Sequence, residues 1–319
     1  FQVGGTLCNL TCHHCFISCS PKNDSFGFLT LQQVRAALEE SGLTGRDIHA
    51  VGMSGQMHGS VFLPKNPDST KVAAIRPALL WNDQRTARQC RTIEEAAGGT
   101  EALVGMAGNA ALTGLTAPKI LWLREHEPAH FAKLATVINP KDYVRFRLTG
   151  DLAIDVGDAS GFGVFDPRQR GWCAPLLRAV GLDESILPRL VESQDVVGQV
   201  TRWAAEQTGL AEGTPVVAGS GDQMTGAIGT GTVAPGLVSA TLGTSGVVFA
   251  HLGDTLGGSL PATLQTMCSA VKGEWCTYGC TLSAAGALHW YRDAFAKSES
   301  FRALDEEAAR IAPGADGLL

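Results

Sequence analysis

Short apolar runs that end in glycine-rich loops recur along the chain from about residue 43 onward. The clearest are 48–53 (followed by Ser-Gly-Gln-Met-His-Gly), 214–218 (followed by Gly-Ser-Gly-Asp) and 238–242, which turns at 243–246 and returns at 247–250. Runs of this length, rich in β-branched residues and bounded by glycine, predict strands. Between them, helical patterns occupy 83–97, 117–125, 172–180 and 283–296. Strands alternating with helices indicate an α/β fold.

The first 43 residues have a different texture. Thr30 and Gln33 have the spacing of a capping box, Val34 and Leu38 follow at helical spacing, and Gly42 is suited to end the helix. A cysteine-rich loop precedes this predicted helix. We therefore expect a separate Cys-rich fragment over residues 1–43.

Composition narrows the class of protein. The chain has 319 residues, is 45% hydrophobic and 18% charged, and carries a formal net charge of −6. This length suggests roughly two domains of about 150 residues each. The Lys and Arg residues form no basic stripe, which argues against nucleic acid, and no apolar run approaches the roughly 18 residues of a membrane span. Four of the nine cysteines lie in the first 19 residues and the other five are spread along the chain. A secreted disulfide scaffold would be short and evenly rich in cysteine, so we expect a cytoplasmic protein with small-molecule chemistry.

Cys8, Cys12 and Cys15 have the spacing C-x₃-C-x₂-C. Three thiolates on one loop can hold three irons of a [4Fe–4S] cluster. The run, with Asn9 and Phe16, resembles the signature of radical S-adenosylmethionine enzymes, which implies that cluster and S-adenosylmethionine as cofactors. Two other interpretations stay open: a zinc site that also uses Cys19 or a histidine, and free cysteines without metal.

A larger set of motifs resembles the FGGY family of carbohydrate kinases, and within it the kinases that act on xylulose. The motifs, in chain order, lie at 50–59, 76–85, 116–119, 140–143, 148–150, 158–161, 219–222 and 242–246. The resemblance covers residues 44–319 and implies an actin-like, ribonuclease-H-like ATPase fold. It implies an N-terminal kinase domain over 44–235, a glycine-rich crossing near 229–236, and the start of a C-terminal domain over 236–319. ATP, Mg²⁺ and a ketose, D-xylulose, are the implied cofactors and substrate.

Asp222 is the candidate catalytic residue. It follows an apolar run and has glycines on both sides, so that a substrate can approach the backbone. A carboxylate there can accept the proton of an attacking hydroxyl, which is the role that the resemblance implies. A plain helix-capping aspartate is the alternative that the residue alone leaves open.

The candidate sugar-binding residues lie in two loops. Met57 and His58 occupy a glycine-bounded loop after a predicted strand, where α/β proteins bind ligands. Trp81, Asn82 and Asp83, with Arg85 nearby, follow an apolar stretch and could recognise hydroxyls, or could simply cap the next helix and cover its surface. The resemblance implies substrate contact for Met57 and His58.

The turn formed by Gly243, Thr244, Ser245 and Gly246 is the candidate phosphate-binding loop. Its N–H groups and hydroxyls can surround phosphate oxygens, although glycines are also common in ordinary hairpins.

Two elements that the family resemblance leads us to expect are not found in the sequence. The Asp-x-Gly-Thr turn that opens these kinases is replaced by residues 1–41, and an adenosine loop would lie after Leu319. We therefore expect a kinase fold incomplete at both ends, with an unpaired sheet edge, a tendency to aggregate and weak or no turnover. A non-catalytic sugar-binding fragment and a homodimer are further possibilities.

Overall fold

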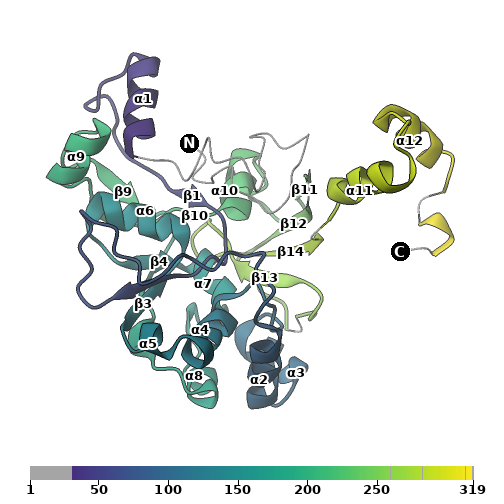
Figure 1. Cartoon of the computed structure of the whole chain (residues 1–319), viewed down its shortest axis with the longest axis horizontal. Helices are drawn as coiled ribbons and strands as arrows, with labels where there is room; N and C mark the ends of the chain where they lie inside the picture. Colours follow the sequence, from purple (N-terminus) through teal and green to yellow (C-terminus); the bar gives the residue numbers. More distant parts are fainter. Residues whose placement is uncertain (1–30, 244, 259, 282, 313, 318–319) are drawn as a thin grey trace.

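The computed structural model describes residues 31–243, 245–258, 260–281, 283–312 and 314–317 (Figure 1). Its α-helices are α1 (Leu31–Ser41), α2 (Ala87–Ala97), α3 (Thr100–Ala107), α4 (Thr116–His126), α5 (Pro128–Phe131), α6 (Pro140–Thr149), α7 (Val156–Ala159), α8 (Ala174–Val180), α9 (Arg202–Thr208), α10 (Asp222–Gly229), α11 (Ala285–Phe295) and α12 (Phe301–Ala308). Short 3₁₀ turns are η1 (Ser160–Phe162), η2 (Glu184–Ile186) and η3 (Ala315–Gly317).

The strands are short and form several small ladders. They are β1 (Ser54–Gly55), β2 (Val61–Pro64), β3 (Leu134–Ile138), β4 (Ala153–Asp155), β5 (Phe165–Asp166), β6 (Gly171–Trp172), β7 (Arg189–Val191), β8 (Val196–Gln199), β9 (Pro215–Val217), β10 (Ser220–Gly221), β11 (Val238–Leu242), β12 (Gly246–Gly253), β13 (Gln265–Cys268) and β14 (Trp275–Thr281). Strands β1 and β10 pair in parallel, as do β4 and β7, whereas β2 with β3, β5 with β6, and β8 with β9 are antiparallel. The mixture of parallel and antiparallel pairs with helices confirms the expected α/β class.

The predicted strand over 48–53 is largely wrong. In that stretch only Val51 forms a bridge, in parallel with Val216, before β1 begins at Ser54. The physical reason is a change of register, because Val51 faces Val216 whereas Ser54 faces Ser220, so the second segment carries one extra residue. Gly219, between Val216 and Ser220, has φ 69°, and a Cβ there would lie 1.9 Å from the Met53 carbonyl oxygen. The kink interrupts the ladder but keeps the two segments side by side.

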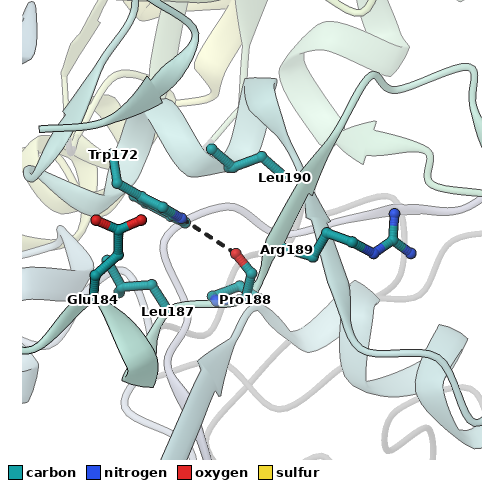
Figure 2. Close-up of a pocket in the computed structure, with 6 residues that line it drawn as sticks. All are labelled: Trp172, Glu184, Leu187, Pro188, Arg189 and Leu190. Carbon is teal, nitrogen blue, oxygen red and sulfur yellow. Dashed lines mark hydrogen bonds between the residues drawn. The ribbon is translucent and has the colours of Figure 1, made fainter.

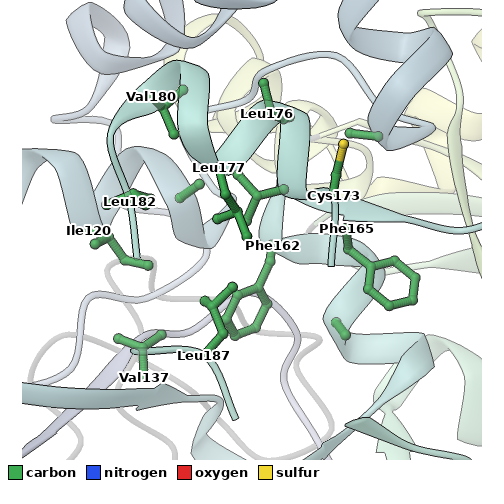
Figure 3. Close-up of a cluster of buried hydrophobic side chains, with 14 of the residues drawn as sticks. Ile120, Val137, Phe162, Phe165, Cys173, Leu176, Leu177, Val180, Leu182 and Leu187 are labelled. Carbon is green, nitrogen blue, oxygen red and sulfur yellow. The ribbon is translucent and has the colours of Figure 1, made fainter. Parts of the chain in front are cut away.

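The largest cluster of buried apolar side chains joins α2, α4 and α8 to the neighbouring strands, and Figure 3 shows part of it. Ile120 and Leu121 of α4 and Leu176 and Leu177 of α8 are fully or almost fully buried there, with Phe162 between the elements. Burial of one such side chain is worth about 1.5–3 kcal/mol. This core therefore fixes α4, whose first turn stands next to the cavity described below.

Helix α1 packs against α9 on the opposite side of the central strands (Figure 1). Val34 and Leu38 lie against the cluster that contains Ala204 and Leu210, and Gly42 ends the helix with φ 69°, as the sequence predicts. Thr30, the other half of the predicted capping box, lies outside the described residues.

The remaining strands form an antiparallel sheet in the order β11-β12-β14-β13. Strand β11 coincides with the predicted run at 238–242, and it forms an edge of this sheet. Helices α11 and α12 extend away from the sheet (Figure 1) and pack on each other through the rings of His289 and Phe301. Among the described residues, no helix has both the length and the apolar character needed to cross a membrane.

Candidate active site

A cavity of about 590 Å³ lies where the end of β1, the start of α10 and the β11–β14 sheet meet. Its walls come from seven parts of the chain and carry mostly amide, hydroxyl and apolar side chains. The lining residues are Gln56, Met57, His58, Trp81, Gln84, Ala110, Leu112, Thr113, Gly114, Leu115, Asp222, Gln223, Ser245, Val247, Ala262, Thr263, Leu264, Gln265, Tyr278, Cys280 and Thr281.

This one cavity brings together residues from all three predicted site groups. Met57 and His58, Trp81, Asp222 and Ser245 all line it. Asn82, Asp83, Gly243 and Gly246 are their chain neighbours and are absent from its walls, and Thr244 lies outside the described residues.

The parallel segments 51–55 and 216–221 explain why Met57, His58 and Asp222 meet. Both segments end at the same edge, so the residues that follow them fall together, as they do at strand ends in α/β proteins. A hydrogen bond of 2.6 Å between the Ser54 and Thr225 hydroxyls ties β1 to α10.

Asp222 is the first residue of α10 and faces the cavity. Its side chain is accessible from the cavity, while protein surrounds it on the other sides. This partial removal of solvent raises the pKa of Asp222 to about 6, and the N–H groups of Asp222 and Gln223 oppose the rise. Among the described residues that line the cavity, Asp222 is also the only carboxylate. It can therefore accept a proton near neutral pH.

His58 presents a neutral ring to the cavity. Its Nδ1 is buried without a hydrogen-bond partner, and a Cβ at Gly161 would lie 2.2 Å from that nitrogen. Burial, with the positive charge of Lys119, lowers the pKa of His58 to about 3, while the Gly161 backbone opposes the shift. Because Nδ1 lies against Gly161, Nε2 is the ring nitrogen available to a ligand.

Met57 forms an apolar part of the wall beside His58. It is buried with Met224, Phe249 and Met267, and its sulfur lies 3.8 Å from the Tyr278 hydroxyl. This combination of soft sulfur and aromatic surface suits the C–H face of a small ligand.

Asp83 faces Arg85 instead of the cavity. The Asp83 carboxylate accepts hydrogen bonds from the Arg85 backbone N–H and from Nε, at 3.1 and 2.8 Å. The Arg85 guanidinium also stacks 4.7 Å from the centre of the Trp122 ring. Gln84, between them in sequence, lines the cavity and accepts a hydrogen bond from Thr113.

The turn at 243–246 joins β11 to β12. The Gly243 N–H donates to the Ser245 carbonyl at 2.9 Å, so one N–H of the predicted phosphate loop is already used within the turn. The Gly243 carbonyl accepts from the Ala285 N–H at the start of α11, which anchors the turn beside the cavity.

Several cavity residues escaped the sequence analysis. Gln56, Gln84 and Gln223 each lie directly beside a predicted site residue, so their position next to the motifs was an available signal. Gln265 and Tyr278 come from β13 and β14, and nothing in the sequence indicated that these strands reach the cavity.

A fully buried network of charged side chains lies beside β10. Lys141 lies 2.7 Å from Asp142, 2.7 Å from Asp155 and 3.1 Å from Asp158, and Arg145 lies 2.7 Å from Asp142. Two cations thus face three carboxyl groups. Burial raises the pKa of Asp158 well above its usual range, and a proton on Asp158 balances the network.

This network reaches the strand that carries Asp222. The second oxygen of Asp155 accepts hydrogen bonds from the hydroxyls of Ser220, at 2.7 Å, and Ser193, at 3.1 Å. Ser220 lies two residues before Asp222, so Asp155 helps to hold the end of β10 in place.

A second, smaller hollow of about 330 Å³ lies beside β7 (Figure 2). Trp172, Glu184, Leu187 and Arg189 contribute to its wall, and the Trp172 indole donates a hydrogen bond of 3.2 Å to the Pro188 carbonyl. No predicted site residue lines it, so the larger cavity is the candidate site.

Comparison with known proteins agrees with the motifs. A sequence profile of the N-terminal domain of the FGGY family of carbohydrate kinases matches residues 28–229, well over half of the chain. The chain belongs to the FGGY family of carbohydrate kinases. Other FGGY members with similar sequences include the xylulose kinase of Bacillus subtilis strain 168, which is 37% identical over 293 residues. That alignment covers 91% of this chain and 57% of the relative.

Solved FGGY structures have the same fold. A "xyloylose kinase" from Brucella ovis is 34% identical, with a TM-score of 0.75, over 87% of this chain and 54% of that one. The xylulose kinase from Rhodospirillum rubrum is 27% identical, with a TM-score of 0.77, over 91% and 59%. The chain therefore spans somewhat more than half the length of these FGGY relatives.

FGGY kinases use ATP and a divalent metal. Among the described residues, no group of three or more His, Cys, Asp or Glu side chains is arranged to hold a metal ion. Mg²⁺ that accompanies a nucleotide is usually held by one or two carboxylates together with phosphate oxygens and water, so Asp222 is the residue of this cavity that would contribute a ligand to it. Cys8, Cys12 and Cys15, the predicted cluster ligands, lie outside the described residues.

Proposed function

We propose that this chain carries the ketose site and the proton acceptor of an ATP-dependent xylulose kinase. One observation supports the proposal above all: Met57, His58, Asp222 and Ser245, predicted from separate motifs, line a single cavity. The similarity to xylulose kinases makes D-xylulose the proposed sugar. A cytoplasmic location fits this substrate and the bacterial relatives.

The proposed reaction follows from the cavity's chemistry. The His58 Nε2 and the neighbouring glutamine side chains hydrogen-bond the sugar hydroxyls, while Met57 contacts its apolar face. Asp222 accepts the proton of the 5-hydroxyl as that oxygen attacks the γ-phosphorus of ATP. The bond to the bridging oxygen breaks, ADP leaves, and D-xylulose 5-phosphate forms. We assign the contacts with phosphate oxygens to Ser245 and its turn, because Ser245 lines the same cavity as Asp222.

The first test is binding and turnover by the whole chain. Calorimetry with D-xylulose measures the site, and a coupled ADP assay with D-xylulose and ATP measures transfer. We expect Asp222→Asn to lower transfer about 10²–10⁴-fold, the usual contribution of a general base, while sugar binding changes little. Asp254→Asn, at an exposed position outside the cavity, is the matched control.

The outcomes separate the alternatives. Measurable transfer that is equal in wild type and Asp222→Asn would contradict the role of Asp222. Sugar binding that depends on His58 without any transfer would instead support a non-catalytic sugar-binding protein.

The spacing of Cys8, Cys12 and Cys15 supports a separate hypothesis, a [4Fe–4S] site in the first 43 residues. Anaerobic reconstitution with iron and sulfide is expected to give a broad absorption near about 400 nm that Cys12→Ala abolishes, as thiolate-bound clusters require. A colourless protein with reduced, reactive thiols would exclude the cluster.

A further inference from the structure

Lys119 is a fully buried lysine that the proposed reaction does not use. It lies in the first turns of α4, and no ion pair joins it to a carboxylate anywhere in the described part of the chain. Burial lowers the pKa of Lys119 to about 7, and the negative charge of Asp83 opposes the shift. An ammonium group buried without a carboxylate partner is costly, so its place in this core calls for a physical reason.

The hydrogen bonds of Lys119 point to that reason. Its Nζ donates to the His58 carbonyl at 2.7 Å and to the Gly114 carbonyl at 2.6 Å. Both acceptor residues line the cavity, on two different walls that are 56 residues apart in the chain. One side chain thus joins the loop 55–59 to the segment 110–115.

The conformation of His58 makes this link more significant. Its φ is 61°, in the left-handed region that residues other than glycine rarely adopt. Such a residue keeps its conformation only where its surroundings hold it. Lys119 holds the carbonyl of that same residue, while the ring is held against Gly161.

The link extends to a third wall. Thr113, next to Gly114, donates a hydrogen bond of 2.6 Å to Gln84, which lines the cavity beside Trp81. The segments around 58, 84 and 114 are therefore joined through Lys119 and Thr113.

We propose that Lys119 is a positioning residue of the sugar site, which sets the separation of the His58 loop and the 110–115 segment through its two carbonyl hydrogen bonds. It does not touch the sugar. This inference rests on the proposed function only in naming a ketose as the ligand, because the link between the two walls is present in the chain itself.

The test replaces Lys119 with methionine, which keeps the apolar stem and removes both hydrogen bonds. Because small displacements of binding groups are costly, we expect D-xylulose to bind roughly tenfold or more weakly. Lys133→Met, at an exposed position, is the matched control and should bind as wild type does. Lys119→Gln, which keeps an N–H donor at the site, should fall between the two, and it serves as the test variant if Lys119→Met does not fold.

Hydrogen exchange gives a readout that needs no sugar. The Gly59 N–H donates to the Met57 carbonyl at 2.8 Å, and the Leu177 N–H donates to Cys173 at 2.9 Å in the core. We expect the Gly59 amide to exchange faster in Lys119→Met while the Leu177 amide is unchanged. A general loss of stability would speed both.

The outcomes keep the two proposals apart. If wild type binds D-xylulose and Lys119→Met binds equally well, the positioning role is wrong and the sugar site stands. If wild type binds no ketose, the proposed function is wrong. The exchange rate of the Gly59 amide then decides by itself whether Lys119 positions the His58 loop. Unchanged exchange there would overturn the positioning role.

Discussion

Asp222 and His58 show how one cavity shifts the pKa values of two residues in opposite directions. Loss of solvent raises the pKa of the Asp222 carboxyl and lowers that of the His58 imidazole, so both favour their neutral forms. The carboxylate is then a better proton acceptor, and the imidazole remains a hydrogen-bonding group without charge over the whole physiological range.

The raised pKa of Asp222 predicts a stability effect. A carboxyl whose folded pKa is about 6, against an ordinary value of 3.8, adds stability while it is protonated and loses it as the pH rises through about 6. Asp222→Asn cannot ionise, so we expect a higher melting temperature than wild type at about pH 7.5 and no difference near about pH 4. Thermal melts of both proteins at the two values check this, and a variant less stable at the higher pH contradicts it.

The contact between Gly161 and His58 predicts a second residue-scale effect. A methyl group at 161 would lie 2.2 Å from the His58 Nδ1, so Gly161→Ala must displace the ring. We expect D-xylulose binding to weaken roughly tenfold or more, as displaced binding groups do. Gly105→Ala is the control, since a Cβ there meets nothing within 4 Å. Calorimetry of both variants decides, and equal affinities would exclude the contact as important.

Sequence patterns predicted the residue types of the site better than their environments. Met57, His58 and Asp222 were predictable because each follows an apolar run, and the ends of parallel segments meet. The orientation of Asp83 was not predictable, because its carboxylate accepts a hydrogen bond from Arg85, two residues later. Tyr278 and Gln265 were out of reach, since they pair in a local hairpin and reach the cavity only because that sheet packs against Met57 and Met224, which no local pattern indicates.

At the scale of elements, long helices and hairpins were predictable and interrupted strands were not. The helix over 117–125 and the strand over 238–242 agree closely with α4 and β11, because their patterns are local. The run at 48–53 failed because its pairing depends on a kink at Gly219, in a segment far away in the sequence.

The charged network between α6, β4 and α7 predicts a large stability effect. Removing Lys141 leaves Asp142, Asp155 and Asp158 buried beside a single remaining cation, Arg145. We expect Lys141→Met to lower the free energy of unfolding by about 3–5 kcal/mol, the usual cost of breaking a buried ion pair.

Lys71→Met is the control for this element. Lys71 pairs with Asp68 at 3.3 Å, but its side chain is 79% exposed, and such surface pairs contribute little. Urea unfolding curves of the two variants compare the buried and exposed pairs directly. Similar losses in both would show that the network is not a support of the fold.

At the scale of the whole molecule, the edge strand β11 has an exposed apolar side. Leu242 is 82% exposed and Val238 is 59% exposed, on a strand with one unpaired edge. Exposed apolar edge strands favour pairing between molecules. We therefore expect the 319-residue chain to self-associate at high concentration.

A charge on the edge should reduce this association. Leu242→Lys places a lysine where natural edge strands often have one, so light scattering after gel filtration should show a smaller average mass. Val72→Lys is matched in exposure, at 82%, but lies outside any strand and should change nothing. Equal average masses for the two variants would show that the β11 edge is not the cause of association.

The extra residue between Val216 and Ser220 makes the cavity depend on one glycine that is not part of its wall. The chain accommodates that residue by bending at Gly219, where φ is 69° and a Cβ would lie 1.9 Å from the Met53 carbonyl oxygen. Any side chain at 219 would therefore push apart the two segments whose ends carry Met57, His58 and Asp222. A single added methyl group, far from any ligand, would be enough to disturb the arrangement.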